Sequence, residues 1–248
     1  MKSNHCVLLT RPLGFNNGLQ DLLHKAGIRS IERPMLEIKR LGMTPETKTL
    51  VMNLDEQDIV IFISQNAVTL GIATLEEYWP QWPQLSWFAV GKGTAQALLK
   101  FGIDAIYPDK ASSENLLALP GLQKVQGSKI MIVRGEGGRE FLAERLKEQG
   151  ARVSYLETYT RVGIDYGETL AKDLYGERVD LCVVTSLEGL NQLSGSLNRA
   201  ELGKLHLIVP SSRIAADAGN QGWVSVTQST GADDEALLQS ILKTTLVI

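Results

Sequence analysis

The stretch Ile130-Met131-Ile132-Val133-Arg134-Gly135-Glu136-Gly137-Gly138 decides the fold of this 248-residue chain. It begins with four consecutive apolar residues, and a continuous run of this length is typical of a strand that is buried on both faces. Similar runs stand at residues 6–9, 59–63 and 181–184. Segments with helical spacing of apolar residues lie between the runs. This alternation predicts an α/β protein whose parallel sheets are covered by helices.

The chain also contains an internal repeat. Leu9-Thr10-Arg11 resembles Ile132-Val133-Arg134, and the glycines that end the following predicted helices, Gly27 and Gly150, stand at the same offset of 123 residues. The repeat predicts two copies of one doubly wound α/β unit. Two such units with a cleft between them make a good small-molecule site. The repeat alone suggests a boundary near residue 123.

Hydroxyl groups, glycines and arginines follow the predicted strands at their carboxyl ends, where open parallel sheets bind ligands. Each group precedes a predicted helix, so backbone N–H groups and the positive helix end favour an anion there. Serine, threonine and asparagine at such places are equally typical of helix N-caps. The predicted binding residues are Thr10, Arg11, Ser64, Gln65, Asn66, Gly91, Lys92, Thr94, Arg134, Gly135, Glu136, Gly137, Thr185, Ser186, Ser211, Ser212 and Arg213.

Composition and missing motifs exclude several function classes. With 28 acidic and 25 basic residues and no block of one sign, the chain does not have the charge of a general nucleic-acid binder. No apolar run is long enough for a membrane span, and the run near the start is too short for a signal peptide. Two cysteines in apolar runs indicate free thiols in a reducing cytoplasm.

The chemical motifs of metal, nucleotide and hydrolase sites are also missing from the sequence. The three histidines and two cysteines do not have zinc-site spacing. No Gly-x-Gly-x-x-Gly, Walker A or Gly-x-Ser-x-Gly pattern occurs. The sequence therefore predicts a site that binds a polyanion. It predicts no metal, strong nucleophile or redox cofactor at this site.

Tyr159 is the one further residue that the sequence singles out. It belongs to an alternating segment, residues 153–161, that we expect where the chain passes between the two units. One interpretation is a half-buried aromatic residue of a strand. The other is a phenol that acts as a hydrogen-bond donor or weak acid in the cleft.

An ordered series of loose motifs runs along nearly the whole chain. Its members are Val7-Leu8-Leu9-Thr10-Arg11-Pro12, Phe62-Ile63-Ser64-Gln65-Asn66-Ala67-Val68, Ala89-Val90-Gly91-Lys92-Gly93-Thr94-Ala95, Val133-Arg134-Gly135-Glu136-Gly137-Gly138-Arg139, Glu157-Thr158-Tyr159-Thr160-Arg161, Thr185-Ser186 and the turn at Ser211. Together they resemble the uroporphyrinogen-III synthase family, which closes the linear tetrapyrrole hydroxymethylbilane. One departure is Ile214, where the family often has a threonine that mirrors Thr94, so this chain has no side-chain hydroxyl group at that position.

The resemblance implies two flavodoxin-like domains joined by a two-stranded linker. It places residues 1–35 with 163–248 in one discontinuous domain and residues 41–156 in the other, with linker strands at 36–40 and 157–162. The implied reaction is dehydration, ring closure and inversion of the last pyrrole ring, without a cofactor. Tyr159 resembles the family tyrosine thought to help the hydroxyl group depart. We also expect a cytoplasmic monomer that contacts the preceding enzyme of the pathway transiently and binds neither nucleic acid nor membrane.

Two rival interpretations stay open at this point. A non-catalytic two-domain binding module, similar in architecture to periplasmic sugar binders, predicts a secretion signal or a fused DNA-binding segment, and neither is visible in the sequence. A nucleotide-dependent enzyme on a Rossmann-like unit predicts the glycine fingerprint that is missing. Incubation with hydroxymethylbilane and separation of the type I and type III products distinguishes all three.

Overall fold

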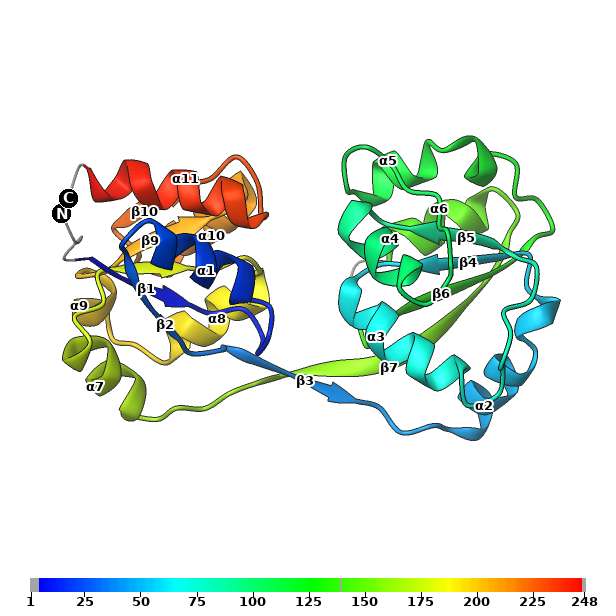
Figure 1. Cartoon of the computed structure of the whole chain (residues 1–248), viewed down its shortest axis with the longest axis horizontal. Coiled ribbons are helices and arrows are strands. Elements are labelled where there is room, and N and C mark those ends of the chain that lie inside the picture. Colours follow the sequence, from blue (N-terminus) through cyan, green and yellow to red (C-terminus); the bar gives the residue numbers. More distant parts are fainter. Residues whose placement is uncertain (1–4, 139, 247–248) are drawn as a thin grey trace. The chain divides into compact units, whose positions relative to one another are not determined.

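The structure, a computed structural model, describes residues 5–138 and 140–246; Arg139, the last residue of one quoted motif, lies outside this description. The chain divides into two compact units. Unit 1 combines Met1–Glu37 with Val162–Ile248, and unit 2 is the continuous stretch Ile38–Arg161 (Figure 1). Each unit is a sheet of five strands with helices on both faces.

The sheet of unit 1 has the strand order β10-β9-β8-β1-β2, and its pairings are all parallel. Its strands are β1 (Cys6–Leu9), β2 (Arg29–Glu32), β8 (Leu181–Val183), β9 (His206–Val209) and β10 (Ser225–Gln228). From β1 the chain moves outward to β2, and it later fills the other side in the order β8, β9, β10. This is the flavodoxin-like order, and it confirms the doubly wound fold class.

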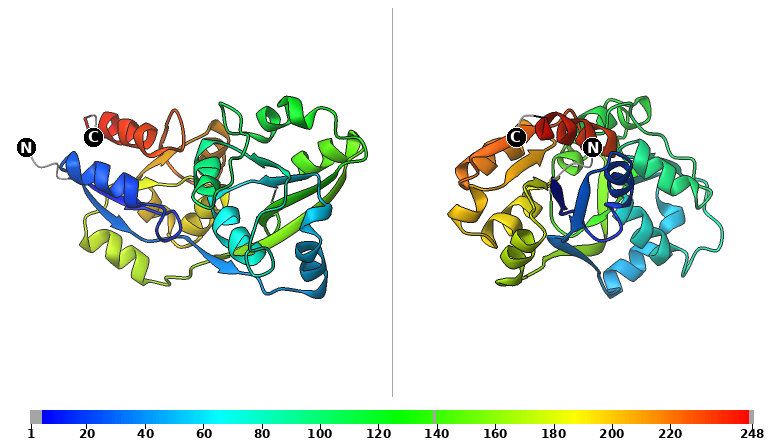
Figure 2. Two further views of the ribbon diagram at one scale, coloured as in Figure 1. Left: turned by 45° about the vertical axis from the view of Figure 1, so that its right-hand side comes forward. Right: turned by 60° about the vertical axis from the view of Figure 1, so that its left-hand side comes forward.

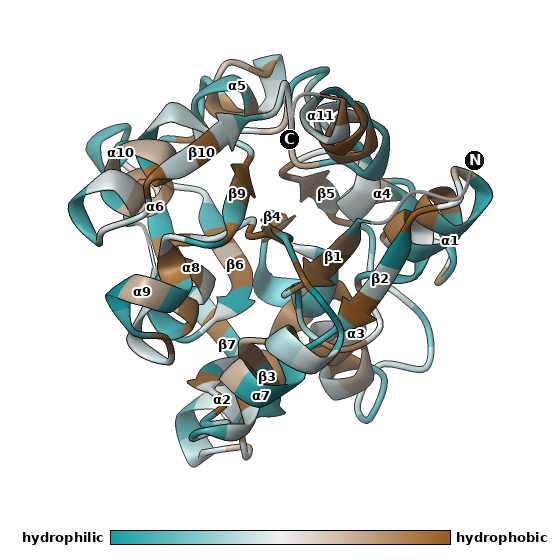
Figure 3. Ribbon diagram, turned by 90° about the vertical axis from the view of Figure 1, so that its left-hand side faces the viewer, coloured by the Kyte–Doolittle hydropathy of each residue, from teal (hydrophilic) through white to brown (hydrophobic). Residues whose placement is uncertain are grey.

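Two helical layers cover this sheet because successive strand residues point to opposite faces. Val7 and Leu9 pack with α1 (Asn17–Lys25) and α11 (Asp234–Thr245), which lie side by side in Figure 2. Leu8 packs on the other face. The helices of that face are α7 (Thr169–Gly176), α8 (Leu187–Gly195), α9 (Arg199–Leu202) and α10 (Ser212–Asn220). Figure 3 shows the hydrophobic strands β1 and β9 between these partly hydrophilic helices.

The sheet of unit 2 has the order β3-β7-β6-β4-β5. Its strands are β3 (Leu36–Arg40), β4 (Ile59–Phe62), β5 (Ser86–Ala89), β6 (Lys129–Gly135) and β7 (Arg152–Gly163). The strands β4 to β7 pair in parallel. The edge strand β3 runs antiparallel to β7, because Leu41 N donates to Thr158 O at 3.0 Å and Ile164 N donates to Met35 O at 3.0 Å.

Helices cover both faces of the second sheet as well. Val60 and Phe62 of β4 face one layer, and Ile59 and Ile61 face the other. The first layer contains α2 (Pro45–Met52), the short helix η1 (Leu54–Glu56), α3 (Gln65–Leu75) and α4 (Lys92–Leu99). The second contains α5 (Ser113–Leu117), the short helix η2 (Pro120–Leu122) and α6 (Phe141–Glu148).

The boundary near residue 123 that the repeat alone suggests is wrong. Residue 123 lies inside unit 2, directly after η2. Strand β4 precedes this position and β6 follows it, yet they are direct neighbours, with Ile59 opposite Ile130 and Phe62 opposite Val133. A cut at residue 123 would separate two strands that share a continuous parallel ladder.

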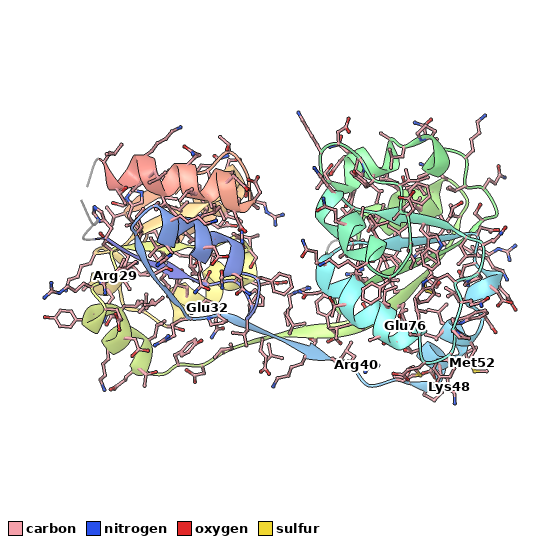
Figure 4. The ribbon with its side chains drawn as sticks, in the orientation of Figure 1. Arg29, Glu32, Arg40, Lys48, Met52 and Glu76 are labelled. Atoms are coloured by element: carbon pink, nitrogen blue, oxygen red, sulfur yellow. The ribbon has the colours of Figure 1, made fainter. Side chains whose placement is uncertain are left out.

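Charged side chains stand on the outer strands of both sheets, where unpaired backbone would otherwise invite another strand. Arg29 and Glu32 lie on β2, and Arg40 ends β3 (Figure 4). Arg29 Nη2 donates to Glu177 O at 2.7 Å, and Arg40 Nη2 forms an ion pair of 2.7 Å with Glu77. Among the helices in the described part of the chain, none is long and apolar enough to cross a membrane.

Several helices end at a glycine with a left-handed backbone conformation, as the sequence predicts. The φ angles are 73° at Gly27, 75° at Gly102, 87° at Gly150 and 97° at Gly222. A residue with a Cβ atom is strained in this region, whereas glycine is not. Glycine at these positions therefore allows each chain turn toward the next strand.

Two glycines at the end of α10 give a test of this argument. Gly222→Ala should lower the free energy of unfolding by about 1–2 kcal/mol, because alanine is strained at its φ of 97°. Gly219→Ala is the matched control: Gly219 lies within α10 and nothing stands within 4 Å of its added Cβ. It should stabilise by about 0.5 kcal/mol. Urea unfolding of both variants measures the two effects, and equal effects would contradict the argument.

Candidate functional site

The predicted binding residues stand at the carboxyl edges of the two sheets. In unit 1 the strand order reverses between β1 and β8, and in unit 2 it reverses between β4 and β6. Ligands of open α/β sheets bind outside the carboxyl ends of strands at such a reversal. The carboxyl ends of these four strands, with the segments that follow them, contain Thr10 and Arg11, Thr185 and Ser186, Ser64 to Asn66, and Arg134 to Gly137. Arg134 and Gly135 are the last two residues of β6, and Gln65 and Asn66 are the first two of α3. The fold therefore brings the predicted residues of each unit to one edge of its own sheet.

In unit 2, the Tyr159 hydroxyl group meets Ser64 at the beginning of α3. The Tyr159 Oη and Ser64 Oγ atoms are 3.0 Å apart. Ser64 is the N-cap of α3, and its Oγ also accepts a hydrogen bond of 3.0 Å from Ala67 N. The tyrosine is 3% exposed and its ring belongs to the core of unit 2. A rigidly packed ring thus holds a phenol group at the positive end of a helix.

Gly135 and Glu136 hold Tyr159 from the neighbouring strand. A Cβ atom on Gly135 would lie 2.5 Å from Cε2 of the tyrosine ring, so only glycine leaves room for the ring. Glu136 N donates to Tyr159 O at 2.6 Å. The backbone N–H of Glu136 is therefore engaged within the protein, while its side chain is exposed.

The loop after β5 approaches the loop after β4. Gly91 is the N-cap of α4, and a Cβ atom there would lie 2.5 Å from Cβ of Ala111. A Cβ on Gly93 would lie 2.8 Å from Nε2 of Gln65, which places the Gln65 amide against the first turn of α4. Lys92 is exposed beside it. These groups form a polar rim near the beginning of α3.

In unit 1 the predicted hydroxyl residues cap helices and connect strands. Thr10 is 4% exposed, and its Oγ1 donates to Val183 O at 2.7 Å, which links the ends of β1 and β8. Ser186 Oγ accepts from Gly189 N at 3.0 Å as the N-cap of α8. Ser211 Oγ accepts from Ile214 N at 3.4 Å as the N-cap of α10. Thr185 is partly exposed, whereas Ser212 and Arg213 are exposed in the first turn of α10.

Two of the predicted arginines are already engaged by carboxylates. Arg11 Nη1 forms an ion pair of 2.5 Å with Asp234, and its side chain is 14% exposed. Arg134 Nη1 forms an ion pair of 2.8 Å with Glu140, and its side chain is 3% exposed. Their charges are matched within the protein before any anion arrives.

Ile214, the departure from the family pattern, faces the core of unit 1. It is 6% exposed and packs in the apolar cluster under α8 and α10, and its counterpart Thr94 is 5% exposed. An inward-facing position in the first turn of a helix accepts an apolar side chain without loss of packing. No hydroxyl group acts at position 214.

Sequence reasoning did not assign a role to Glu140, Tyr155 or Arg161. Glu140 contacts both Arg134 and Tyr155 through its two carboxylate oxygens. The Arg161 guanidinium lies 5.7 Å from the centre of the Tyr159 ring. Because residues two apart on a strand point to the same face, the segment Tyr159-Thr160-Arg161 carried a signal for this last contact.

The described residues contain no group of three histidine, cysteine or acidic side chains that could hold a metal ion. Burial raises the pKa of the Cys182 thiol, and burial likewise raises the pKa of the Cys6 thiol. Both thiols stay protonated near neutral pH and are poor nucleophiles. The hydroxyl groups at the carboxyl edges of the sheets can donate and accept hydrogen bonds.

Comparison with known proteins gives consistent matches over most of the chain. A family model described as uroporphyrinogen-III synthase HemD matches residues 17–239. The uroporphyrinogen-III synthase of Escherichia coli (strain K12) is 35% identical over 243 residues, which cover 95% of this chain and 99% of that protein.

Two solved structures support the fold. The uroporphyrinogen-III synthetase of Helicobacter pylori has a TM-score of 0.65 at 13% identity, with 97% of this chain and 99% of that chain covered. A mutant uroporphyrinogen III synthase of Thermus thermophilus has a TM-score of 0.62 at 20% identity, with 98% and 99% covered. The structural matches show the fold and the sequence matches show the family: this chain belongs to the uroporphyrinogen-III synthase family.

Proposed function

We propose that this enzyme converts hydroxymethylbilane to uroporphyrinogen III, with Tyr159 as the group that assists departure of the hydroxyl group. The observation that carries the role of Tyr159 is its 3.0 Å contact with Ser64 at the beginning of α3. A phenol that is fixed by a packed ring and oriented by a helix cap is already arranged to donate to an arriving oxygen atom.

The substrate supplies the electrons for the reaction. The lone pair of the pyrrole nitrogen expels the hydroxymethyl oxygen, which takes up a proton and leaves as water. The resulting cation-like azafulvene is attacked by the substituted carbon of the terminal ring, which gives a spiro species. Rearrangement inverts that ring, and proton loss restores the pyrrole, so that one water is lost overall. No strong base is needed, and positioning of the flexible chain is the main contribution of the protein.

A short chain of hydrogen bonds supports the departing oxygen. Ala67 N donates to Ser64 Oγ, and either hydroxyl group can donate in the contact between Ser64 Oγ and Tyr159 Oη. In this proposal the Ser64 hydroxyl donates to Tyr159 Oη when the Tyr159 hydroxyl donates to the leaving group. Each bond polarises the next, and the positive end of α3 favours negative charge that develops on the phenol oxygen. This interaction strengthens as the carbon–oxygen bond breaks, which is the requirement for catalysis.

We propose that the carboxylates of the substrate bind to helix N-termini and polar side chains at the carboxyl edges of the sheets. Helix N-termini favour anions even where the net charge of the protein is negative, as it is here at −3. The direct ligands in this proposal are Ser64, Gln65, Asn66, Lys92, Gly137, Thr185, Ser186, Ser211, Ser212 and Arg213. The predicted residues Thr10, Gly91, Thr94 and Gly135 are buried, and Glu136 N is bonded to Tyr159 O, so we assign these five a supporting role. Arg11 and Arg134, which pair with carboxylates of the protein, fit a supporting role better.

The setting of the reaction is also a proposal. We infer that the enzyme acts as a monomer in the cytoplasm and receives hydroxymethylbilane in transient contact with the enzyme that forms it. Two free and buried cysteines support a reducing compartment.

The activity itself is tested by product analysis. Incubation of the purified chain with hydroxymethylbilane should give the type III isomer, whereas the substrate alone closes to the type I isomer. Chromatographic separation of the two isomers measures the ratio. A non-catalytic binding module would bind the substrate and leave the type I isomer as the product, and that result would reject the proposal.

Tyr159→Phe tests the role of the phenol. It should lower kcat by about 10²–10⁴-fold with little change in KM, because assistance by a general acid is typically worth that factor. The phenylalanine keeps the ring that packs against Gly135, so the fold should persist. Steady-state kinetics with circular dichroism makes the measurement, and a kcat within about threefold of wild type, roughly 0.65 kcal/mol, would show that the phenol is not the acid.

The three capping serines provide the matched controls. Ser186→Ala and Ser211→Ala remove a cap hydroxyl from unit 1, and each should lower the rate by roughly 2- to 12-fold. Ser64→Ala removes the same kind of cap and also the partner of Tyr159. The rate of Ser64→Ala should fall between those of the other serine variants and that of Tyr159→Phe. A loss of rate equal to that of Ser186→Ala would show that Ser64 does not support the catalytic role of Tyr159.

A further inference from the structure

We propose that Arg134 is a positioning residue: with Glu140 and Tyr155 it fixes the glycine-containing end of β6 against Tyr159, and it does not bind the substrate. This inference rests on the proposed function of Tyr159. Arg134, Glu140, Tyr155 and Glu157 are called the Arg134 cluster below. Each of its contacts lies within unit 2.

The Arg134 side chain is enclosed by protein atoms on several sides. It is 3% exposed, and its Nη1 contacts Glu140 Oε1 at 2.8 Å while its Nε lies 3.8 Å from Glu157 Oε1. Its guanidinium carbon lies 4.6 Å from the centre of the Tyr155 ring. A ligand carboxylate would have to displace these partners to reach the guanidinium group.

The charges around Arg134 also disfavour binding of an anionic substrate. The Arg134 guanidinium faces the carboxylates of Glu140 and Glu157, and the Lys147 ammonium lies 5.9 Å from the centre of the Tyr155 ring, so two cations are matched by two carboxylates here. The guanidinium group is enclosed whereas the Glu140 side chain is half-exposed, so loss of this carboxylate leaves an enclosed positive charge without its nearest partner. A polyanionic substrate therefore gains little from Arg134, whereas the protein gains a fixed anchor.

The anchor holds the backbone that touches Tyr159. Arg134 Nε donates to Gly135 O at 3.1 Å, and Gly135 leaves the space that the Tyr159 ring fills. A Cβ atom on Gly138 would lie 3.2 Å from Nη2 of Arg134, so the loop passes directly over the guanidinium group. A shift of Arg134 would move this backbone and, with it, the ring of Tyr159.

Glu140 and Tyr155 complete the anchor from α6 and β7. Glu140 precedes α6, and its second carboxylate oxygen accepts a hydrogen bond from the Tyr155 hydroxyl. This bond and the Arg134 guanidinium lower the pKa of Glu140, and burial together with the Glu140 carboxylate raises the pKa of Tyr155 to about 12. Glu140 thus stays ionised and Tyr155 stays a donor across the neutral range, so the cluster keeps its geometry there.

The test compares kcat, KM and the ratio of type III to type I product for Glu140→Gln, Tyr155→Phe and Arg134→Lys. Arg145→Gln is the matched control, since it breaks an exposed arginine–glutamate pair of 2.5 Å on α6 outside the cluster. Wild type is assayed first, because failure to form type III product rejects the proposed function and not the positioning role. Circular dichroism and thermal unfolding establish that each variant is folded.

Positioning predicts that Glu140→Gln and Tyr155→Phe lower kcat by roughly 10- to 100-fold and increase the share of type I product. KM should stay within about twofold of wild type, because no substrate contact is lost. The change of KM with salt concentration should match that of wild type. Arg134→Lys keeps the positive charge but loses the planar guanidinium group with its several donors. Its kcat and product ratio should therefore resemble those of the other two variants. Arg145→Gln should match wild type.

A substrate-binding Arg134 gives the opposite pattern. Glu140→Gln would then release the guanidinium group from a competing carboxylate, lower KM and steepen its dependence on salt, with kcat unchanged. That result overturns the proposal, as does an unchanged kcat in folded Tyr155→Phe. Tyr155→Phe keeps the aromatic ring under the guanidinium group, so it remains informative if the charge variants fail to fold.

Discussion

Burial of both faces of the parallel strands is the constraint on which the rest of this structure depends. The four residues of β1 and the four of β4 are all buried, with helices packed on each side. Polar side chains are excluded from β1 and β4, because a buried polar group without a partner is costly. The polar groups of this part of each sheet therefore gather where these strands end, and parallel pairing places those ends at one edge. The polar loops of each unit are a direct result.

The two copies of the internal repeat also place an arginine in similar contacts. Arg11 follows β1 and Arg134 is the last residue but one of β6. Each pairs with an acid and donates to a nearby backbone carbonyl, at Phe15 and Gly135 respectively. In both copies the arginine fixes the loop between strand and helix. The acids differ, because Asp234 begins α11 whereas Glu140 lies six residues after Arg134. The two arginines thus pair with acidic residues from different parts of the fold.

The apolar runs and the helix-ending glycines made the strands and the fold class predictable, because both depend on neighbours in sequence. The pairing of Ser64 with Tyr159 was not predictable, since these residues are 95 positions apart and meet only after β4, β6 and β7 align. The sequence predicts Arg134 as an anion ligand, and its enclosure by Glu140, Glu157 and Tyr155 was not predictable, because an exposed and an enclosed arginine look alike in sequence. The internal repeat predicts two similar α/β units. It also suggests a domain boundary near residue 123, which is wrong, because similarity between the copies does not show which strands pair.

The discontinuity of unit 1 has a consequence for how the chain folds as it is synthesised. Unit 2 is one continuous stretch, so all of its strands leave the ribosome before the last strands of unit 1 exist. Strand β1 pairs with β8, with Leu8 opposite Cys182, and such a distant contact closes slowly. Until then β1, β2 and α1 have one apolar edge uncovered. The growing chain therefore exposes this apolar edge throughout the synthesis of unit 2, and the edge is covered only when β8 has left the ribosome.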